Sequence, residues 1–520
     1  MVKKDYLILA VIVCAAIGVR VLAIWVGRPE FVGWFSHTYY YFVQTQSVLV
    51  DGSLAFSDLP LIFYLYAAIA KLQTVFGVEP RTAILSSTRL VMTIVPALIA
   101  LPIYSLVRAV GREKKLSILQ WLVVAASAFL PLTIAQLPEI LQKNMLGLVL
   151  FGCLQAAVYR ALRLYTHRAG AIIVLLTGVI FLTHLGTFAA VLFFFAAIGI
   201  AFLLNEGFSR TVLLGLLLIL AGAVVSGLSL YLIDSSRFER IIYYIGHSLY
   251  NSQLGKLFVS QSGLERLQFL AGIVGTALIS TLFFLLYRRA QPELAREDRI
   301  FWLGNIILLY LLLFPMIDVD LLVRFLVFAS IPLLVIQMYL LAHITNRWIK
   351  RTFVIVFAVV CLVTGFGEVM GVLVRNGQNR IVQAELFSIQ DRRLFGPNDL
   401  IITKYSVNPL CNWFFSTRSG LITSLNLSDF AKYENVFILN PNEGEMTPEV
   451  AERLRNREII SEVDRYEVTR NNIIVPAAGA LILKTDNLEI YRIEGPPNEW
   501  TFDRSGRWTG YLAKEENDPL

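Results

Sequence analysis

Apolar residues form long blocks through the first 375 positions, and short polar or basic stretches separate the blocks. About eleven blocks are long enough to cross the roughly 30 Å hydrocarbon core of a bilayer as helices. These blocks are residues 6–26, 90–107, 116–135, 145–159, 171–186, 188–204, 211–232, 268–287, 300–315, 321–342 and 353–374. The pattern predicts an all-α, multi-pass membrane domain over residues 1–375.

Two more helices are expected in the long segment after the first block. Residues 37–50 are amphipathic and rich in tyrosine, which suits the membrane interface. Residues 60–76 are apolar enough to span, but a crossing there would invert the charge pattern of every later loop. We therefore expect both segments to be juxtamembrane helices of the first outer loop.

The distribution of Lys and Arg predicts the orientation. Loops on one side of the predicted spans hold 17 Lys and Arg in 49 residues, and those on the other side hold 9 in 112. Because positive charge favours the cytoplasmic side, we expect a cytoplasmic N-terminus in the inner membrane of a prokaryote. An odd number of spans places the C-terminal region outside the cytoplasm.

Composition separates the chain into two parts. The whole chain is 56% hydrophobic and 16% charged, against roughly 25% charged residues in a soluble protein. Residues 376–520 nevertheless hold 37 of the 83 charged residues. Strand-like alternation at 398–405, 435–439, 459–468, 478–483 and 489–493, with helix-like segments at 409–417, 428–433 and 447–457, predicts a small soluble α/β domain over 376–520.

The excess of positive charge lies in the membrane part, so it argues for membrane orientation and against a nucleic-acid partner. The four cysteines are scattered, and the soluble part has no Gly-rich phosphate loop, paired-histidine spacing or nucleophile elbow. No cofactor is expected, and no motif indicates a metal, although a divalent cation is compatible with the chemistry considered below.

Ionisable and polar residues in or beside membrane spans are costly and by default suggest a lined cavity. All such residues in this chain fall near the predicted outer face, and Asp318 and Asp320 also fit a tight turn. The set is His37, Asp58, Glu139, Lys143, Asn144, His184, Asp318, Asp320 and Arg324. Their shared depth predicts one outward-facing site.

Each candidate also has a structural interpretation. Glu139 and Lys143 are four residues apart, as in an ordinary exposed ion pair on a helix. His184 lies beside a turn, which favours a bond to the backbone over catalysis. Arg324 fits either snorkelling to the headgroups or binding of a lipid phosphate. Asp58 fits the start of a helix.

Several short motifs follow one another in order along residues 1–375. They are Asp51-Gly52, the segment Ser57–Tyr64, Thr88-Arg89-Leu90, the basic turn Arg108–Arg112, Pro138-Glu139, Lys143-Asn144 and Arg324-Phe325. In order and sidedness they resemble the GT-C superfamily of membrane glycosyltransferases. This superfamily includes dolichyl-phosphate-mannose mannosyltransferases, aminoarabinose transferases and oligosaccharyltransferases, although a Trp-Trp-Asp motif of the last branch is absent from the C-terminal region.

The resemblance implies an enzyme that transfers a sugar from a polyprenyl-phosphate-linked donor to a glycan, lipid or protein acceptor at the bilayer. Such a reaction needs a base for the acceptor hydroxyl and cations for the departing phosphate. Glu139, His37 and Asp58 are the catalytic candidates. The substrate-binding candidates are Lys143, Asn144, Arg324 and His184.

One departure from the GT-C pattern leaves alternatives open. GT-C enzymes usually carry an acidic residue just past the first helix, where this chain has Gly33–Tyr40, and Glu30 is the nearest carboxylate. His37 or Glu30 substitutes for it, Glu139 acts as the base, or the chain is a non-catalytic relative. A transporter or flippase of lipid-linked saccharides is a further hypothesis, ranked lower because no internal repeat is found.

Overall fold

The computed structural model describes most of the chain. It covers residues 2–26, 36–56, 58–111, 116–130, 142–164, 166–207, 252–259, 263–317, 319–343, 385–386, 388–390, 392–404, 407–415, 417–441 and 472–511, with isolated positions in 221–242 and 346–363.

The chain forms two compact units, each built from segments that are distant in the sequence. The first unit comprises Met1–Gly27, Phe56–Ile69 and Arg89–Val372, and the second comprises Arg28–Ala55, Ala70–Thr88 and Leu373–Leu520. The first outer loop is therefore divided between the units. The predicted boundary between residues 375 and 376 lies outside the described residues and stays a prediction.

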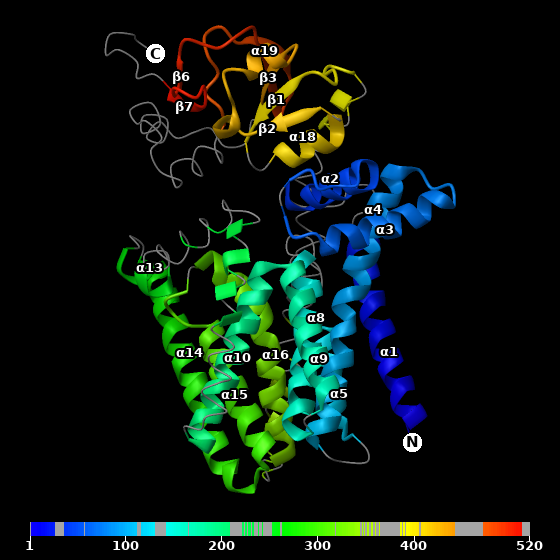
Figure 1. Cartoon of the computed structure of the whole chain (residues 1–520), viewed down its shortest axis with the longest axis vertical. Coiled ribbons are helices and arrows are strands. Elements are labelled where there is room, and N and C mark those ends of the chain that lie inside the picture. The colour runs from blue at the N-terminus through cyan, green and yellow to red at the C-terminus, as the bar shows by residue number, and fades with distance from the viewer. Residues whose placement is uncertain are drawn as a thin grey trace. The chain divides into compact units, whose positions relative to one another are not determined.

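The first unit is a bundle of helices, several of which run side by side (Figure 1). Its helices are α1 (Val2–Val21), α5 (Ala100–Gly111), α6 (Ile118–Ala128), α8 (Gln142–Arg163), α9 (His167–Thr183), α10 (Leu185–Glu206), α13 (Gln253–Val259), α14 (Gly263–Ala290), α15 (Arg296–Leu312) and α16 (Val319–His343), with the short turns η1 (Leu22–Val26), η2 (Val95–Ile99) and η4 (Gln291–Glu293). Helices α3 (Leu61–Val75) and α4 (Pro80–Ile94) contribute residues to both units.

Within the described residues, five helices are long and apolar enough to cross a membrane. They are Pro80–Val110, Gln142–Arg163, Leu185–Glu206, Arg266–Glu293 and Arg324–His343. Most of the predicted spans coincide with described helices, and those at 211–232 and 353–374 lie mostly outside the described residues. The predicted all-α, multi-pass membrane domain is confirmed.

The span predicted at 90–107 is longer in the structure. Helix α4, the 3-10 turn η2 and α5 form one continuous rod over Pro80–Val110. Pro96 lies in η2, where its missing N–H and its ring interrupt α-helical hydrogen bonding. The rod therefore tightens to 3-10 geometry there and does not end.

Helices α8, α10 and α16 run parallel. Phe151 of α8 contacts Phe194 of α10 and Phe328 of α16, with ring centroids 5.8 and 6.0 Å apart. One turn earlier on α8, Gly147 faces Thr187 of α10 so closely that a Cβ built on the glycine would lie 2.7 Å from Thr187 Cγ2. Further along, Tyr159 of α8 and Tyr339 of α16 both donate to Asp298. Contacts thus follow the same order along the three helices, which begin at one end of the bundle.

The second unit contains a five-stranded mixed sheet with strand order β2-β1-β3-β5-β4. Its strands are β1 (Leu400–Thr403), β2 (Arg418–Gly420), β3 (Val436–Pro441), β4 (Ala480–Lys484) and β5 (Leu488–Ile493), and a separate hairpin consists of β6 (Trp500–Phe502) and β7 (Trp508–Tyr511). Strand β1 pairs in parallel with both β2 and β3, whereas β5 pairs antiparallel with β3 and β4. The predicted small α/β domain is confirmed, although β2, β6 and β7 were not predicted.

Both faces of the central strands are covered, because alternate side chains point to opposite faces of a sheet. Ile401, Phe437 and Leu439 share one core with α18 (Asn408–Phe415) and with α2 (Ser36–Asp51) from the first outer loop. Their neighbours on β1 and β3 form a second core with Trp500 and Trp508. A short helix, α19 (Asp429–Lys432), and the turn η5 (Ile422–Ser424) complete the unit.

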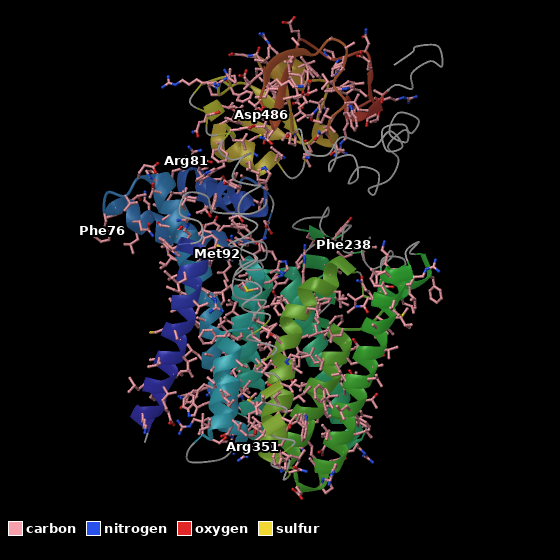
Figure 2. The ribbon with its side chains drawn as sticks, turned by 180° about the vertical axis from the view of Figure 1, so that it is seen from behind. Phe76, Arg81, Met92, Phe238, Arg351 and Asp486 are labelled. Atoms are coloured by element: carbon pink, nitrogen blue, oxygen red, sulfur yellow. The ribbon has the colours of Figure 1, made fainter. Side chains whose placement is uncertain are left out.

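The two helices predicted for the first outer loop exist as α2 and α3. The tip of α3 is strongly exposed, with Phe76 accessible just after the helix ends (Figure 2). Their placement at a membrane surface stays a prediction. In the C-terminal region, the helix predicted at 447–457 and the strand predicted at 459–468 lie outside the described residues.

Candidate functional site

Asp58 and Lys143 form an ion pair within the first unit, although they are 85 residues apart in sequence. Asp58 precedes α3, and its Oδ1 accepts the N–H of Leu59 at 2.7 Å, which fixes the carboxylate at the helix start. Its Oδ2 pairs with Nζ of Lys143, in the first turn of α8. Both side chains are about 10% exposed, so the pair is shielded from water and stronger than a surface ion pair.

Helix α3 holds the first turn of α8 through two further contacts. The hydroxyl of Tyr66 donates a buried 2.7 Å hydrogen bond to Oε1 of Gln142, the residue before Lys143. The ring of Phe63 lies under the lysine, with its centroid 5.0 Å from Nζ. Because Asp58, Phe63 and Tyr66 all contact this turn, the position of the Lys143 ammonium is fixed from one side.

The start of α10 flanks the same turn from another side. Gly147 lies one turn beyond Lys143 on α8 and touches Thr187, which is in the first turn of α10. Parallel helices that begin side by side direct the positive ends of their dipoles toward the same region. This end of the bundle therefore favours an anion.

Arg324 joins this region from α16. It lies four residues before Phe328, on the face of α16 that contacts Phe151 of α8. Arginine side chains on a helix lean toward the helix N-terminus, here toward the level of Lys143. Arg324 is half-buried, and no hydrogen bond or ion pair involves it among the described residues.

His184 has a clear structural task. It separates α9 from α10 with an extended backbone (φ −168°), and its Nδ1 accepts the N–H of Thr187 at 3.3 Å. This is an N-cap, which satisfies one of the open N–H groups at the start of α10. The predicted role of His184 in substrate binding stays a prediction.

Asn144 follows Lys143 and is 1% exposed. Neither its Oδ1 nor its Nδ2 has a hydrogen-bond partner in the described part of the chain. Because a buried amide without partners is costly, this side chain is one of the least satisfied polar groups at this end of the bundle.

Two sequence-predicted catalytic residues are not placed. Glu139 lies outside the described residues, so its predicted pairing with Lys143 is not tested. His37 is in α2 of the second unit, and its side chain is not described. The side chains of Asp318 and Asp320 are likewise outside the described part. Among the described residues, no group of three or more His, Cys, Asp or Glu could hold a metal ion, and the expectation of no cofactor stays a prediction.

Three residues of this region were not predicted from the sequence: Tyr66, Gln142 and Thr187. Tyr66 lies in an apolar run, and Gln142 and Thr187 are ordinary polar residues near helix starts. The spacing of three between His184 and Thr187, typical of an N-cap and the N–H it accepts, is the one signal that could have indicated Thr187.

The geometry describes a membrane protein whose helical bundle carries a buried carboxylate–ammonium pair, with an arginine at the same end of the bundle, where several helices begin. Its fold is similar to that of ArnT, a protein of which two crystal structures match this chain. The crystal structure of ArnT from Cupriavidus metallidurans bound to undecaprenyl phosphate matches it with a TM-score of 0.55, at 12% identity over 94% of this chain and 99% of ArnT. The apo state of the same protein matches with a TM-score of 0.51, at 11% identity over 96% and 100% of the two chains.

ArnT is a GT-C glycosyltransferase. The GT-C resemblance seen in the sequence is thus confirmed for the fold. No protein-family model matches the sequence, and no curated protein matches it either.

Proposed function

We propose that this chain is a GT-C-type glycosyltransferase that moves a sugar from a polyprenyl-phosphate-linked donor to an acceptor hydroxyl at the outer face of the cytoplasmic membrane. The observation that carries the proposal is the Asp58–Lys143 pair at the start of α8. The undecaprenyl phosphate bound to ArnT, which has the same fold, supports a polyprenyl phosphate as the carrier lipid.

Lys143 and Arg324 bind the phosphate of the donor. An ammonium has three N–H donors, so Lys143 can keep its bond to Asp58 and still donate to a phosphate oxygen. The guanidinium of Arg324 adds a planar pair of donors. The N-terminal ends of α8, α10 and α16 reinforce both cations with their dipoles.

The reaction is a single displacement at the anomeric carbon of the sugar. The acceptor oxygen forms a bond to this carbon while the bond from the carbon to the phosphate oxygen breaks, which inverts the anomeric centre. The electron pair leaves with the polyprenyl phosphate, whose charge the two cations stabilise. Asp58 takes the acceptor proton, and Glu139 and His37 are the other candidate bases.

Sugar transfer in vesicles tests this function. The full chain is incubated with undecaprenyl phosphate carrying a radiolabelled sugar and with membrane extract as the source of acceptor. Asp58→Asn is expected to lower kcat by about 100-fold or more. Lys143→Gln is expected to weaken donor binding as well. Lys71→Gln, at an exposed lysine on the same helix as Phe63 and Tyr66, serves as the matched control and should leave transfer unchanged.

Two outcomes contradict the proposal. Undiminished transfer in Asp58→Asn removes this carboxylate from the mechanism, and Glu139→Gln then tests the next base. A wild-type protein that neither transfers sugar nor binds undecaprenyl phosphate is not an enzyme of this class.

A further inference from the structure

Asn144 and Thr187 share an unusual property beside Lys143. Asn144 is 1% exposed and Thr187 is 0% exposed. Among the residues that the structure describes, both amide atoms of Asn144 and Oγ1 of Thr187 lack a hydrogen-bond partner. Buried polar groups in proteins are nearly always paired, so two adjacent exceptions require an explanation.

The packing of three helices brings these two side chains to one place. Asn144 lies seven residues before Phe151 on α8, and Thr187 lies seven residues before Phe194 on α10. Seven residues correspond to two helical turns, so each residue is on the same face as the phenylalanine that follows it, and those two rings are in contact. Thr187 also touches Gly147, three residues from Asn144. Asn144 and Thr187 therefore lie on the facing sides of α8 and α10, within about one helical turn of each other along the bundle.

The chemistry of the two groups fits hydroxyls. An amide both donates and accepts hydrogen bonds, and a threonine hydroxyl does the same. A sugar hydroxyl also donates and accepts, so it can satisfy both partners at once. The lipid phosphate proposed for Lys143 is esterified through one oxygen to the anomeric carbon, so the sugar ring adjoins the phosphate, and Asn144 is the next residue after Lys143 on α8.

We infer that Asn144 and Thr187 form a subsite that binds hydroxyl groups of the donor's sugar ring and so distinguishes a sugar-bearing lipid from the bare lipid phosphate. This inference rests on the proposed function. It assigns sugar recognition to α8 and α10, and phosphate recognition to Lys143 and Arg324.

Binding measurements separate the two kinds of recognition. The full chain in nanodiscs is titrated with undecaprenyl phosphate, and with undecaprenyl phosphate carrying glucose, galactose, mannose or an aminopentose. Wild type should bind at least one sugar-bearing lipid more tightly than the bare lipid. Asn144→Leu and Thr187→Val, which keep the side-chain shape, should weaken that tighter binding by about ten-fold and change binding of the bare lipid by no more than about two-fold. Lys143→Gln should weaken the binding of both the sugar-bearing lipid and the bare lipid.

Thermal unfolding of the same variants excludes a merely structural role. Replacing an unsatisfied buried amide with an apolar group of similar shape removes a desolvation cost. Asn144→Leu should therefore leave Tm unchanged or raise it while sugar recognition is lost. Gln155→Leu is the matched control: Gln155 is also a fully buried amide of α8, and neither of its amide atoms has a hydrogen-bond partner within the described ranges. It lies three turns further on the same face, about 16 Å away, and its variant should leave binding of both lipids unchanged.

Each remaining outcome overturns the inference in a distinguishable way. If wild type binds all lipids equally, or if Asn144→Leu and Thr187→Val leave the preference intact, internal water occupies these groups and the lipid-phosphate site stands without them. If Asn144→Leu lowers Tm and weakens the binding of both kinds of lipid equally, the Asn144 amide has a structural role. If wild type binds neither kind of lipid, the proposed function fails together with the inference.

Discussion

Gly147 lets α8 approach α10 at the end of the bundle where the candidate site lies. Any side chain at this position would meet Thr187, whose Cγ2 would be 2.7 Å and whose Cβ would be 3.0 Å from the new Cβ. The close contact places the first turns of the two helices beside each other. The absence of a side chain at residue 147 is thus a condition for the arrangement of Lys143 and Asn144.

Gly147→Ala is expected to destabilise the bundle by about 1–3 kcal/mol, because the added methyl group overpacks a filled contact. Thermal unfolding in detergent measures the change. Gly178→Ala is the matched control, since a Cβ at Gly178 on α9 would meet nothing within 4 Å. It should be neutral or slightly stabilising because alanine favours a helix more than glycine does. Equal Tm values for the two variants would show that α8 and α10 separate freely.

At the residue scale, the sequence indicated several residues of the candidate site but not which of them pair with one another. Asp58, Lys143, Asn144 and Arg324 stood out because polar residues in apolar surroundings are costly. The partner of Lys143 could not be predicted. Glu139, four residues earlier, has the spacing of an ion pair on one helix, whereas Asp58 is 85 residues away and its proximity depends on the fold. Thr187 could have been noticed only through its N-cap spacing to His184, and that spacing does not reveal that its hydroxyl is buried.

At the element scale, Asp298 joins three helices. Its Oδ1 accepts hydrogen bonds from the hydroxyls of Tyr159 on α8, at 2.6 Å, and Tyr339 on α16, at 3.0 Å. Asp298 itself is on α15 and is 2% exposed. Trp302 stacks on Tyr339 one turn away, with ring centroids 5.2 Å apart. The carboxylate is therefore a buried junction, and its two donors share one acceptor.

Asp298→Asn should destabilise the protein by about 1.5–3 kcal/mol, because charge-assisted hydrogen bonds are lost in a buried place. Tyr159→Phe and Tyr339→Phe should each destabilise the protein less than Asp298→Asn does. The double variant should differ from the sum of the two single variants, since the phenols share one carboxylate oxygen. Denaturation of all four proteins gives the coupling energy. Strict additivity would contradict a shared junction.

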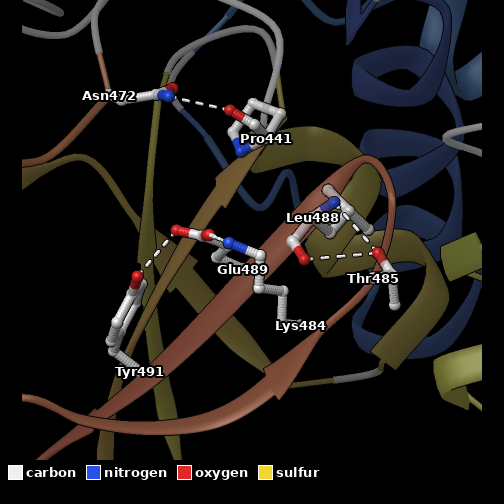
Figure 3. A network of polar contacts seen from close by, with 7 residues as sticks. All are labelled: Pro441, Asn472, Lys484, Thr485, Leu488, Glu489 and Tyr491. Atoms are coloured by element: carbon white, nitrogen blue, oxygen red, sulfur yellow. Dashed lines mark hydrogen bonds and ion pairs between the residues drawn. The ribbon is translucent and has the colours of Figure 1, made fainter. Parts of the chain in front are cut away.

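The β4–β5 hairpin carries a network of polar contacts (Figure 3). Lys484 and Tyr491 both donate to Glu489, each at 2.6 Å. The Lys484 ammonium, followed by the Tyr491 hydroxyl, lowers the pKa of Glu489 below its ordinary value of 4.5. Burial, followed by the bond to Glu489, raises the pKa of Tyr491 to about 12.

These shifts predict the effect of pH on the hairpin. A carboxylate with a lowered pKa stabilises the folded state above its unfolded pKa, and this contribution is lost as pH falls through the folded pKa, below about 4.5. A tyrosine with a raised pKa contributes fully below its ordinary pKa near 10, and the contribution is lost as pH rises toward about 12.

Glu489→Gln should lower the pKa of Tyr491 from about 12 toward 10 without reaching it, because burial persists. A ring-carbon NMR titration, with Tyr491→Phe to assign the signal, measures this value. A Tyr491 pKa that stays near 12 in Glu489→Gln would show that the carboxylate has no influence on the phenol.

The elements differ in how well a pattern predicts them. Long apolar runs and alternating strands were predicted correctly, because periodicity directly reflects burial. The hairpin of β6 and β7 was missed because its strands are three and four residues long, too short to show alternation. The 3-10 turn at Pro96 could have been anticipated from the proline, but whether the helix would end or continue there depends on packing.

At the scale of the whole molecule, the second unit is completed by the first outer loop. Tyr39 and Phe42 of α2 stack against Phe414 and Trp413 of α18, with ring centroids 5.6 and 5.2 Å apart. Arg81, at the start of α4 (Figure 2), donates to the carbonyls of Trp413 and Phe414. These are among the last carbonyls of α18, which favour a cation.

Arg81→Met should loosen the contact between the loop and the C-terminal sheet. The lost hydrogen bonds are expected to cost about 1.5–3 kcal/mol. Cys411 on α18 reports the opening: it is fully buried in this core, and burial raises the pKa of its thiol far above its ordinary value. Alkylation of Cys411, followed by peptide mass spectrometry, should accelerate by about ten-fold or more. Arg492→Ala, at an exposed arginine of β5, is the control, and equal alkylation rates in the two variants would contradict the prediction.

The shared core of α2 and α18 has a consequence for biosynthesis. The chain between Asp51 and Asn408 is more than 350 residues long, which takes a ribosome about 20–70 s to produce at 5–20 residues per second. During that interval the aromatic side chains of α2 have already been made, but α18, which packs against Tyr39 and Phe42, has not. A chaperone that shelters nascent apolar segments is therefore expected to hold this stretch until the last quarter of the polypeptide emerges.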